Sequence, residues 1–406
     1  MTNQFDYDAV IVGGGLAGLA AATRLRQYRV LLLEKENRIG GRVLTFQHGN
    51  HHFDVGACFA FGGTSLIEQD SHHKYQLIQE EDDVGIFING VVYFDSKVTK
   101  ACKQIPVSAT QSEELISFAR SKVDCNALSS SSYELVNYLF KVINPGDLSQ
   151  YSSSLNKYVF ANFDLSHWAP GNQVATDLCL SQLTADIVSN TTVTKVEDHG
   201  TSVKVHSLSE GRESAISTRA AIVATPGIIA KEIIETSDNA CARLLESVRY
   251  GAFTVVALVY EKATILPFRY ISCVDTDLST VIQQASADKT TTALLAYYDD
   301  RASQEIAHLD ASEILAKAVE DLGQLSIGVE KEPTVLRSEI KRWKFGGTIL
   351  TDEMLAARSP FANQASKRVF LAGDYTWPAD LSYGMIDAVK SGLAAGELLK
   401  RSIEEL

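Results

Sequence analysis

The first forty residues alternate between apolar runs and a glycine-rich turn. Apolar residues occupy Ala9–Val12, an alanine- and leucine-rich stretch follows, and a second apolar run covers Val30–Glu34. Continuous apolar runs around a helical pattern are typical of buried parallel strands in a βαβ unit. The pattern therefore predicts strand, helix and strand, and an α/β fold with a parallel sheet.

The rest of the chain predicts further strands and helices without an internal repeat. Residues 61–184 are less regular, with a β-like run at 84–94 and helix-prone stretches at 112–121 and 132–143. Residues 190–207 predict a hairpin, and a strand follows from Ala220. Further β runs at 252–261, 293–298 and 339–347, a helix at 311–325, a strand at 368–374 and a long C-terminal helix complete the pattern.

Composition and charge exclude several classes of protein. The 406 residues are 45% apolar and 21% charged, as in a globular protein, and acids outnumber bases by 50 to 37. The formal charge of −13 disfavours nucleic acid as a partner, because a phosphate backbone would be repelled. The six cysteines form no paired motif, no apolar run is long enough for a membrane helix, and no secretion signal is recognisable. We expect a cytoplasmic protein with reduced thiols and no membrane anchor.

The glycine-rich turn has the spacing of a dinucleotide-binding motif. Gly13, Gly15 and Gly18 form GxGxxG between a strand and a helix, and Glu34 ends the next strand. The glycines allow a tight turn, close approach of a pyrophosphate and close helix packing, and the acid accepts ribose hydroxyls. Leu16 and Ala17 open the helix, whose N-terminus favours phosphate. An acid at Glu34 disfavours a 2′-phosphate, which leaves FAD or NAD.

The residues after Glu34 distinguish between these two cofactors. The run to Arg42 ends in Gly-Gly-Arg and resembles the flavin-containing amine oxidase superfamily, which includes monoamine oxidases, protoporphyrinogen oxidase and phytoene-desaturase-like enzymes. The resemblance implies that Gly41 and Arg42 contact the FAD pyrophosphate. It also implies that Asp54-Val55-Gly56 lies beside the flavin.

The C-terminal residues resemble the closing FAD motif of the same family. A strand ends in Ala-Gly-Asp, and a small-residue helix begins near Gly384. The resemblance implies that Asp374 binds the ribityl–phosphate part of FAD. It also implies that the helix containing Met385 and Ile386 directs its N-terminus at the flavin. Val193 resembles the family valine whose backbone pairs with adenine.

Three aromatic residues are the candidates for the catalytic site. Trp343 resembles the tryptophan that packs by the isoalloxazine ring, and Tyr383 and Trp377 are further candidates to face the flavin. Tyr375 is a candidate to line the pocket.

Two residues that the family uses at the flavin are missing from this chain. Many members carry a lysine that holds a water at flavin N5, and here Thr254 or Val255 stands near its place. The cysteine that links flavin covalently is also missing, so FAD is expected to be non-covalent. The histidines near Asp54 lack ligand spacing, so no metal is expected.

The resemblance implies a two-domain FAD-dependent oxidoreductase. A Rossmann-type FAD domain is expected from residues 1–60, 185–250 and 335–406, and an interleaved α+β substrate domain from 61–184 and 251–334. The expected reaction is hydride transfer from a small amine or amino-acid-derived substrate to flavin N5, with oxygen as re-oxidant. A desaturase or dehydrogenase of a C–C or ring C–N bond remains an alternative, as does a non-catalytic flavin-binding subunit. The sequence does not identify the substrate or the oligomeric state.

Overall fold

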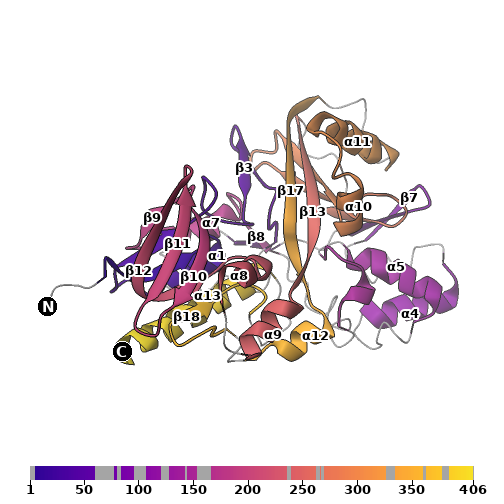
Figure 1. Ribbon diagram of the computed structural model, residues 1–406. Coiled ribbons are helices and arrows are strands. Elements are labelled where there is room, and N and C mark those ends of the chain that lie inside the picture. The colour runs from indigo at the N-terminus through magenta and orange to yellow at the C-terminus, as the bar shows by residue number, and fades with distance from the viewer. Residues whose placement is uncertain are drawn as a thin grey trace.

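A computed structural model describes most of the chain, in segments that end where placement becomes uncertain. The described residues are 5–59, 77–79, 84–95, 107–119, 128–141, 144–152, 166–235, 239–261, 266, 269–325, 334–359, 363–376 and 384–405. Two seven-stranded sheets dominate these residues. In Figure 1 the sheet that contains β11 and β12 lies on the left, and the long strands β13 and β17 stand beside it.

The first sheet is built around the N-terminal strand. β1 (Tyr7–Val12) pairs in parallel with β2 (Val30–Leu33) and with the end of β12 (Arg212–Val223), and every residue of β2 is buried. β9 (Asp186–Val188) extends the sheet beyond β2, and β18 (Val369–Leu371) pairs with β12. Strands buried on both faces explain the continuous apolar runs, so the predicted βαβ unit is confirmed.

An antiparallel extension adds two strands to this sheet. β10 (Thr192–Asp198) and β11 (Val203–Ser209) form the predicted hairpin, and β11 pairs with the first half of β12. Three helices pack on the sheet: α1 (Leu16–Thr23), α7 (Gln173–Leu180) and α13 (Met385–Glu405). The N-terminal and C-terminal segments of the chain are therefore neighbours in this layer.

The second sheet combines segments from three parts of the chain. Its order is β17 (Val335–Ile349), β13 (Arg249–Tyr260), β16 (Thr292–Tyr298), β15 (Thr280–Ala285), β14 (Tyr270–Cys273), β6 (Val84–Ile88) and β7 (Val91–Asp95). α10 (Asp300–Glu305) and α11 (Ala311–Gln324) belong to the apolar cluster on one face. β17 lies within the expected FAD-domain segment 335–406 but pairs with β13, and the domain boundaries stay a prediction.

A hairpin connects the two sheets. β3 (Thr45–His48) and β4 (His51–Asp54) lead into Val55 and Cys58, and these residues pack against β13 and β16. The pairing of β5 (Leu77–Gln79) with β8 (Ser166–Trp168) forms another small sheet. After the glycine-rich turn the chain forms α1 and β2, and the β3–β4 hairpin then leads it to the second sheet.

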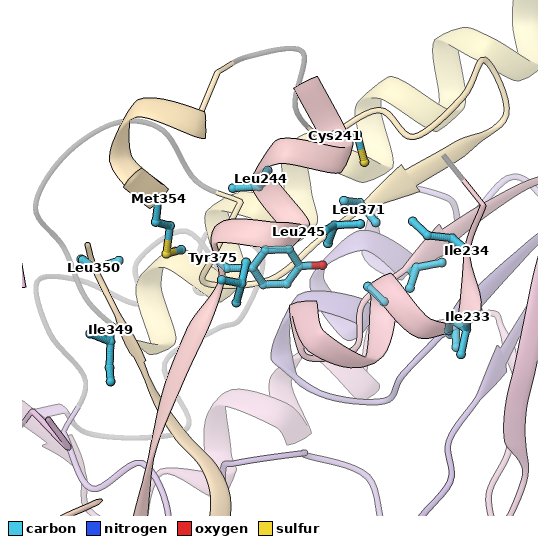
Figure 2. Packing of buried hydrophobic residues seen from close by; sticks show 14 of the residues in the cluster. Ile233, Ile234, Cys241, Leu244, Leu245, Ile349, Leu350, Met354, Leu371 and Tyr375 are labelled. Atoms are coloured by element: carbon cyan, nitrogen blue, oxygen red, sulfur yellow. The ribbon is translucent and has the colours of Figure 1, made fainter. Parts of the chain in front are cut away.

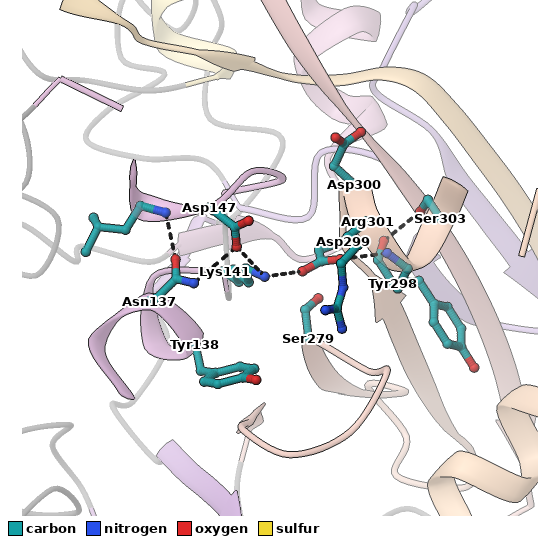
Figure 3. A network of polar contacts seen from close by, with 12 residues as sticks. Asn137, Tyr138, Lys141, Asp147, Ser279, Tyr298, Asp299, Asp300, Arg301 and Ser303 are labelled. Carbon is teal, nitrogen blue, oxygen red and sulfur yellow. Dashed lines mark hydrogen bonds and ion pairs between the residues drawn. The ribbon is translucent and has the colours of Figure 1, made fainter. Parts of the chain in front are cut away.

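A buried ion pair holds the helical layer of residues 107–152 to the second sheet. This layer contains α4 (Ala109–Ala119), α5 (Ser130–Phe140) and a short 3₁₀ turn, η2 (Leu148–Gln150). Lys141 Nζ lies 2.6 Å from Asp147 and 2.9 Å from Asp299, the N-cap of α10 (Figure 3). This pair fixes the end of α5 beside Asn144 and Pro145.

An apolar cluster fills the space below the first sheet. It includes side chains from α8 (Gly227–Ile233), α9 (Asn239–Ser247) and α12 (Asp352–Ala357). Tyr375 lies in the middle of this cluster, near Leu245 and Met354 (Figure 2), and is fully buried. Tyr375 does not line the cavity described below, so the prediction that it lines the pocket is wrong. The reason is that the turn after Gly373 directs the ring into the core.

Candidate cofactor and substrate site

A cavity of about 740 Å³ lies between the two sheets. Some of its lining residues come from the ends of β1 and β2 and from the start of α1. Others come from β13, β16 and β17 in the second sheet. Ligands of open α/β sheets bind outside the carboxyl ends of the parallel strands, and the cavity opens there.

The glycine-rich turn leaves the start of α1 open toward the cavity. Gly13 has a φ of +106°, and a Cβ there would lie 2.8 Å from the carbonyl oxygen of Ala224. A Cβ at Gly18 would lie 2.0 Å from the carbonyl oxygen of Gly13, so the helix packs directly on the turn. Gly15 is the N-cap and carries no capping side chain. The N–H groups of the first helical turn therefore face a position that suits a phosphate.

Glu34 is fixed beside this turn by two backbone hydrogen bonds. Its carboxylate accepts from the N–H of Gly14 at 2.7 Å and from the N–H of Glu36 at 2.9 Å. The side chain is buried and lines the cavity. Each carboxylate oxygen has a second lone pair, so the group retains acceptor capacity toward hydroxyls in the cavity.

An ion pair joins the two ends of the chain inside the cavity. Arg42 Nη2 lies 2.9 Å from Asp374 Oδ1, and Thr348 Oγ1 donates a hydrogen bond of 2.6 Å to Oδ2. Burial alone would raise the pKa of Asp374. The charge and hydrogen bond of Arg42, together with the Thr348 hydrogen bond, outweigh burial and lower that pKa below its ordinary value. Both residues line the cavity as charged groups.

Three aromatic side chains on adjacent strands form one wall of the cavity. Phe253 on β13 is the strand partner of Trp343 on β17, and its ring meets Tyr297 of β16 edge-on at 5.9 Å. Trp343 Nε1 donates a hydrogen bond of 2.7 Å to the carbonyl oxygen of Val55. We call Phe253, Tyr297 and Trp343 the aromatic wall. It gives the cavity an aromatic side in addition to the charged pair and the glycine turn.

The buried side chains of Tyr297, in the aromatic wall, and of Cys58, next to it, stay protonated and neutral. Burial raises the pKa of Cys58 to about 12, so its thiol stays protonated and is a poor nucleophile. Burial also raises the pKa of Tyr297 well above its ordinary value. Asp54 lies behind them, and burial raises its pKa to about 6 despite hydrogen bonds from Thr45 and Asn172. Cys58 and Tyr297 are therefore not bases near pH 7, and Asp54 does not line the cavity.

Most of the residues expected from the sequence meet at this cavity. Its lining includes eleven of the expected residues: Gly13, Gly15, Leu16, Ala17, Glu34, Gly41, Arg42, Val193, Trp343, Asp374 and Met385. Gly18 and Ile386 are buried and do not line it. Tyr383 and Trp377 lie outside the described residues. The role of each residue toward a cofactor stays a prediction.

Sequence reasoning missed the residues that the second sheet contributes. Phe253, Tyr297 and Lys341 line the cavity, but no local motif marks them. Thr254 and Val255, which stand near the place of the family lysine, are buried within the sheet and do not line the cavity. Strand alternation alone could have suggested that Phe253 and Val255 share a face, but not which face meets the cofactor domain.

Metal-binding clusters and membrane-spanning helices are absent from the described residues. No group of three or more histidine, cysteine, aspartate and glutamate side chains there is arranged to hold a metal ion. None of the helices in the described segments combines the length and apolar character required to cross a membrane.

Two family models match the chain. The model described as "Flavin containing amine oxidoreductase" matches residues 102–399, and an "NAD(P)-binding Rossmann-like domain" matches residues 11–76. The second match confirms the Rossmann-type domain, and the sheets confirm the predicted α/β class.

Curated relatives match only a short stretch. Nicotine dehydrogenase of Pseudomonas putida (strain DSM 28022 / S16) is 46% identical over 57 residues, which cover 14% of this chain and 12% of that protein. The 1-hydroxycarotenoid 3,4-desaturase of Flavobacterium sp. (strain P99-3) is 44% identical over 50 residues, 12% of this chain and 10% of that protein. The aligned stretch thus spans about a tenth of these relatives' length.

Solved structures match over nearly the whole chain. Cyclohexylamine oxidase from Brevibacterium oxydans IH-35A has a TM-score of 0.74 at 17% identity, covering 98% of this chain and 99% of its own. A redesigned putrescine oxidase has a TM-score of 0.73 at 16% identity, with 97% and 99% covered. These likenesses establish the two-domain fold. Since the first family model spans most of the chain, the protein belongs to the family of flavin-containing amine oxidoreductases.

Proposed function

We propose that the protein binds FAD non-covalently and oxidises a small amine or amino-acid-derived substrate, with oxygen as re-oxidant. The observation that carries the proposal is the Arg42–Asp374 ion pair. It joins the two terminal motifs inside a cavity that the aromatic wall also lines. An arginine suits a pyrophosphate, and Glu34 at the end of β2 suits a ribose.

The residues present fit FAD. Gly41 has a φ of +57°, and a Cβ there would lie 3.0 Å from Gly15 Cα, so two glycines leave room where a pyrophosphate would pass. The start of α13 at Met385 presents helix N–H groups to the cavity. A helix N-terminus stabilises negative charge, which suits a flavin that gains charge on reduction.

Bound FAD would supply the chemistry by accepting a hydride at N5 and then reducing oxygen to hydrogen peroxide. The chain's own residues would place the substrate. The aromatic wall would pack against its carbon skeleton and exclude water, which favours the neutral amine whose lone pair assists C–H cleavage. With the thiol of Cys58 protonated and Thr254 buried, we assign no side-chain base to the step.

The test is anaerobic titration of the purified protein with amines and amino acids while flavin absorbance is followed. Bleaching by an amine and peroxide formation after air is admitted are the expected results. Failure of every amine and amino acid to bleach bound flavin would contradict the proposed reaction. Acid precipitation tests non-covalent binding, because released flavin then appears in the supernatant.

A matched pair of variants tests the cofactor site. Arg42→Gln is expected to weaken FAD binding roughly tenfold or more, because a charge-assisted contact is lost. Arg29→Gln is the control, since Arg29 pairs with Asp8 and does not line the cavity. Equal FAD affinity in both variants would contradict the assignment of Arg42.

A desaturase or dehydrogenase acting on a C–C or ring C–N bond is a second candidate. The specific observation in its favour is the mainly apolar aromatic wall without a lysine from β13, because such a wall suits a substrate that offers no amine. Bleaching by an unsaturated or cyclic hydrocarbon-like substrate, with no bleaching by amines, would support this candidate.

A further inference from the structure

Two lysines line the cavity, and one of them lies beside the aromatic wall. Lys341 Nζ lies 4.8 Å from the ring centroid of Trp343, and Lys344 Nζ lies 5.4 Å from the ring centroid of Phe345. Both belong to β17, and both line the cavity. Neither forms an ion pair within the parts of the chain that the structure describes, although the protein has 50 acidic and 37 basic side chains.

The acidic side chains of the cavity have other partners or positions. Glu34 accepts backbone hydrogen bonds at the end of β2, and Asp374 pairs with Arg42. Glu36 pairs with Lys35. The remaining lining acids, Glu232 on α8 and Asp387 on α13, make no ion pair with either of the two lysines. The positive charge beside the aromatic wall is therefore not neutralised by the described side chains.

A bulge in β17 lies close to these lysines. Phe253 pairs with Trp343 and Gly251 with Gly347, so three residues of β17 lie opposite one residue of β13. A Cβ at Gly346 would lie 2.9 Å from the Phe253 ring and 3.0 Å from its backbone nitrogen, so the bulge requires glycine there. Lys341 lies in the regular part of the strand opposite Val255, and Lys344 lies in the bulge. Bulges re-aim side chains, and every residue from Lys341 to Thr348 borders the cavity.

Lys341 is partly buried and Lys344 is exposed. Both ammonium groups can therefore stay hydrated in the cavity and meet an anion that enters it. We propose that Lys341 and Lys344 bind a carboxylate of the substrate, whose apolar body packs on Phe253 and Trp343. This inference rests on the proposed function and narrows its substrate class. The substrate is an amino acid or another amine that carries a carboxylate, and not a diamine.

The same two charges also favour reaction of such a substrate. A cationic group near a bound ammonium lowers the ammonium pKa, because like charges disfavour the charged form. The carboxylate would hold the substrate while the neighbouring amine loses its proton to water. A diamine lacks the anchoring anion, and each of its ammonium groups is repelled.

The experiment compares benzoate with its neutral isostere benzamide by titration calorimetry on the purified protein. Variants are Lys341→Met and Lys344→Met, with Lys341→Arg as a charge-preserving variant. Lys204→Met is the matched control, because Lys204 is a partly buried strand lysine on β11 outside the cavity lining. Flavin content is measured separately by absorbance, so failure of the proposed function is visible independently of anion binding.

We expect wild type to prefer benzoate over benzamide. Lys341→Met should weaken benzoate binding about tenfold or more and benzamide binding less than about twofold. Lys341→Arg and Lys204→Met should keep the preference, and added salt should reduce it. Two results would overturn the inference: an unchanged benzoate-to-benzamide ratio in Lys341→Met, or loss of flavin from that variant with the ratio unchanged. The second result would assign the lysines to the cofactor.

Discussion

The Arg42–Asp374 pair makes a quantitative prediction for stability without cofactor. Asp374→Asn preserves the size of the side chain and an acceptor for Thr348, but it removes the counter-charge of Arg42. Asp374 is 7% exposed and Arg42 is 32% exposed. Breaking a fully buried pair costs about 3–5 kcal/mol, and an exposed pair contributes about 0–1 kcal/mol. Because Arg42 reaches the cavity, we expect an intermediate loss of about 2 kcal/mol in the free energy of unfolding.

The assay is urea unfolding of the apoprotein in a double-mutant cycle with Arg42→Met. The cycle isolates the coupling between the two side chains from their other contacts. A coupling energy of about 1–2 kcal/mol is expected at pH 7. A coupling energy below about 0.5 kcal/mol would refute the reasoning, because solvent-exposed ion pairs give such values.

The same cycle has a pH dependence with a definite sign. The folded-state pKa of Asp374 lies below its ordinary value, so its stabilisation is present above the unfolded pKa near 4 and is lost as pH falls through the folded pKa. The stability difference between wild type and Asp374→Asn should therefore shrink on acidification. A difference that grows below pH 4 would contradict the assigned direction.

Three further substitutions test other parts of the structure. Tyr375→Phe should raise the free energy of unfolding by about 1 kcal/mol in urea, because the fully buried phenol oxygen has no hydrogen-bond partner among the described residues; a loss would show that it has one. Lys141→Met should lower stability by about 3 kcal/mol, because it leaves Asp299 buried and unpaired, whereas the surface control Lys195→Met should cost less than about 1 kcal/mol. Asp54 has a folded pKa of about 6, so wild type should lose stability as pH rises from 4 to 6. Asp54→Asn should flatten that slope, and an unchanged slope would exclude Asp54 as its source.

Local sequence was sufficient where the structure depends on neighbours along the chain. The strand at Ala9–Val12, the glycine turn and the helix after it follow from apolar periodicity and from the conformational needs of Gly13. The hairpin of β10 and β11 follows from alternation. The resemblance of both terminal motifs to the flavin-containing amine oxidase superfamily indicated Arg42 and Asp374, although these residues are more than 300 positions apart.

A motif alone did not show whether a side chain lies in the cavity or in the apolar core. Tyr375 directly follows the cavity residue Asp374, yet its ring lies in the apolar cluster with Leu245. The backbone turn after Gly373 sets that direction, because Gly373 has a φ of +155° and the ring folds back against it. One residue along the chain therefore separates a cavity side chain from a core side chain.

The sequence by itself determined the βαβ unit, because that unit depends on short-range periodicity. The resemblance of its terminal motifs to known flavoenzymes indicated the family and the terminal residues that meet in the cavity. Only the tertiary structure decided which side chains form the substrate side. Phe253, Tyr297 and Trp343 become neighbours through the order and register of β13, β16 and β17. The pairing of β17 with β13 also places Lys341 and Lys344 at the edge of the same cavity. Strand pairing between distant segments depends on how their apolar faces pack against the rest of the molecule, and alternation within one strand carries no information about that partner.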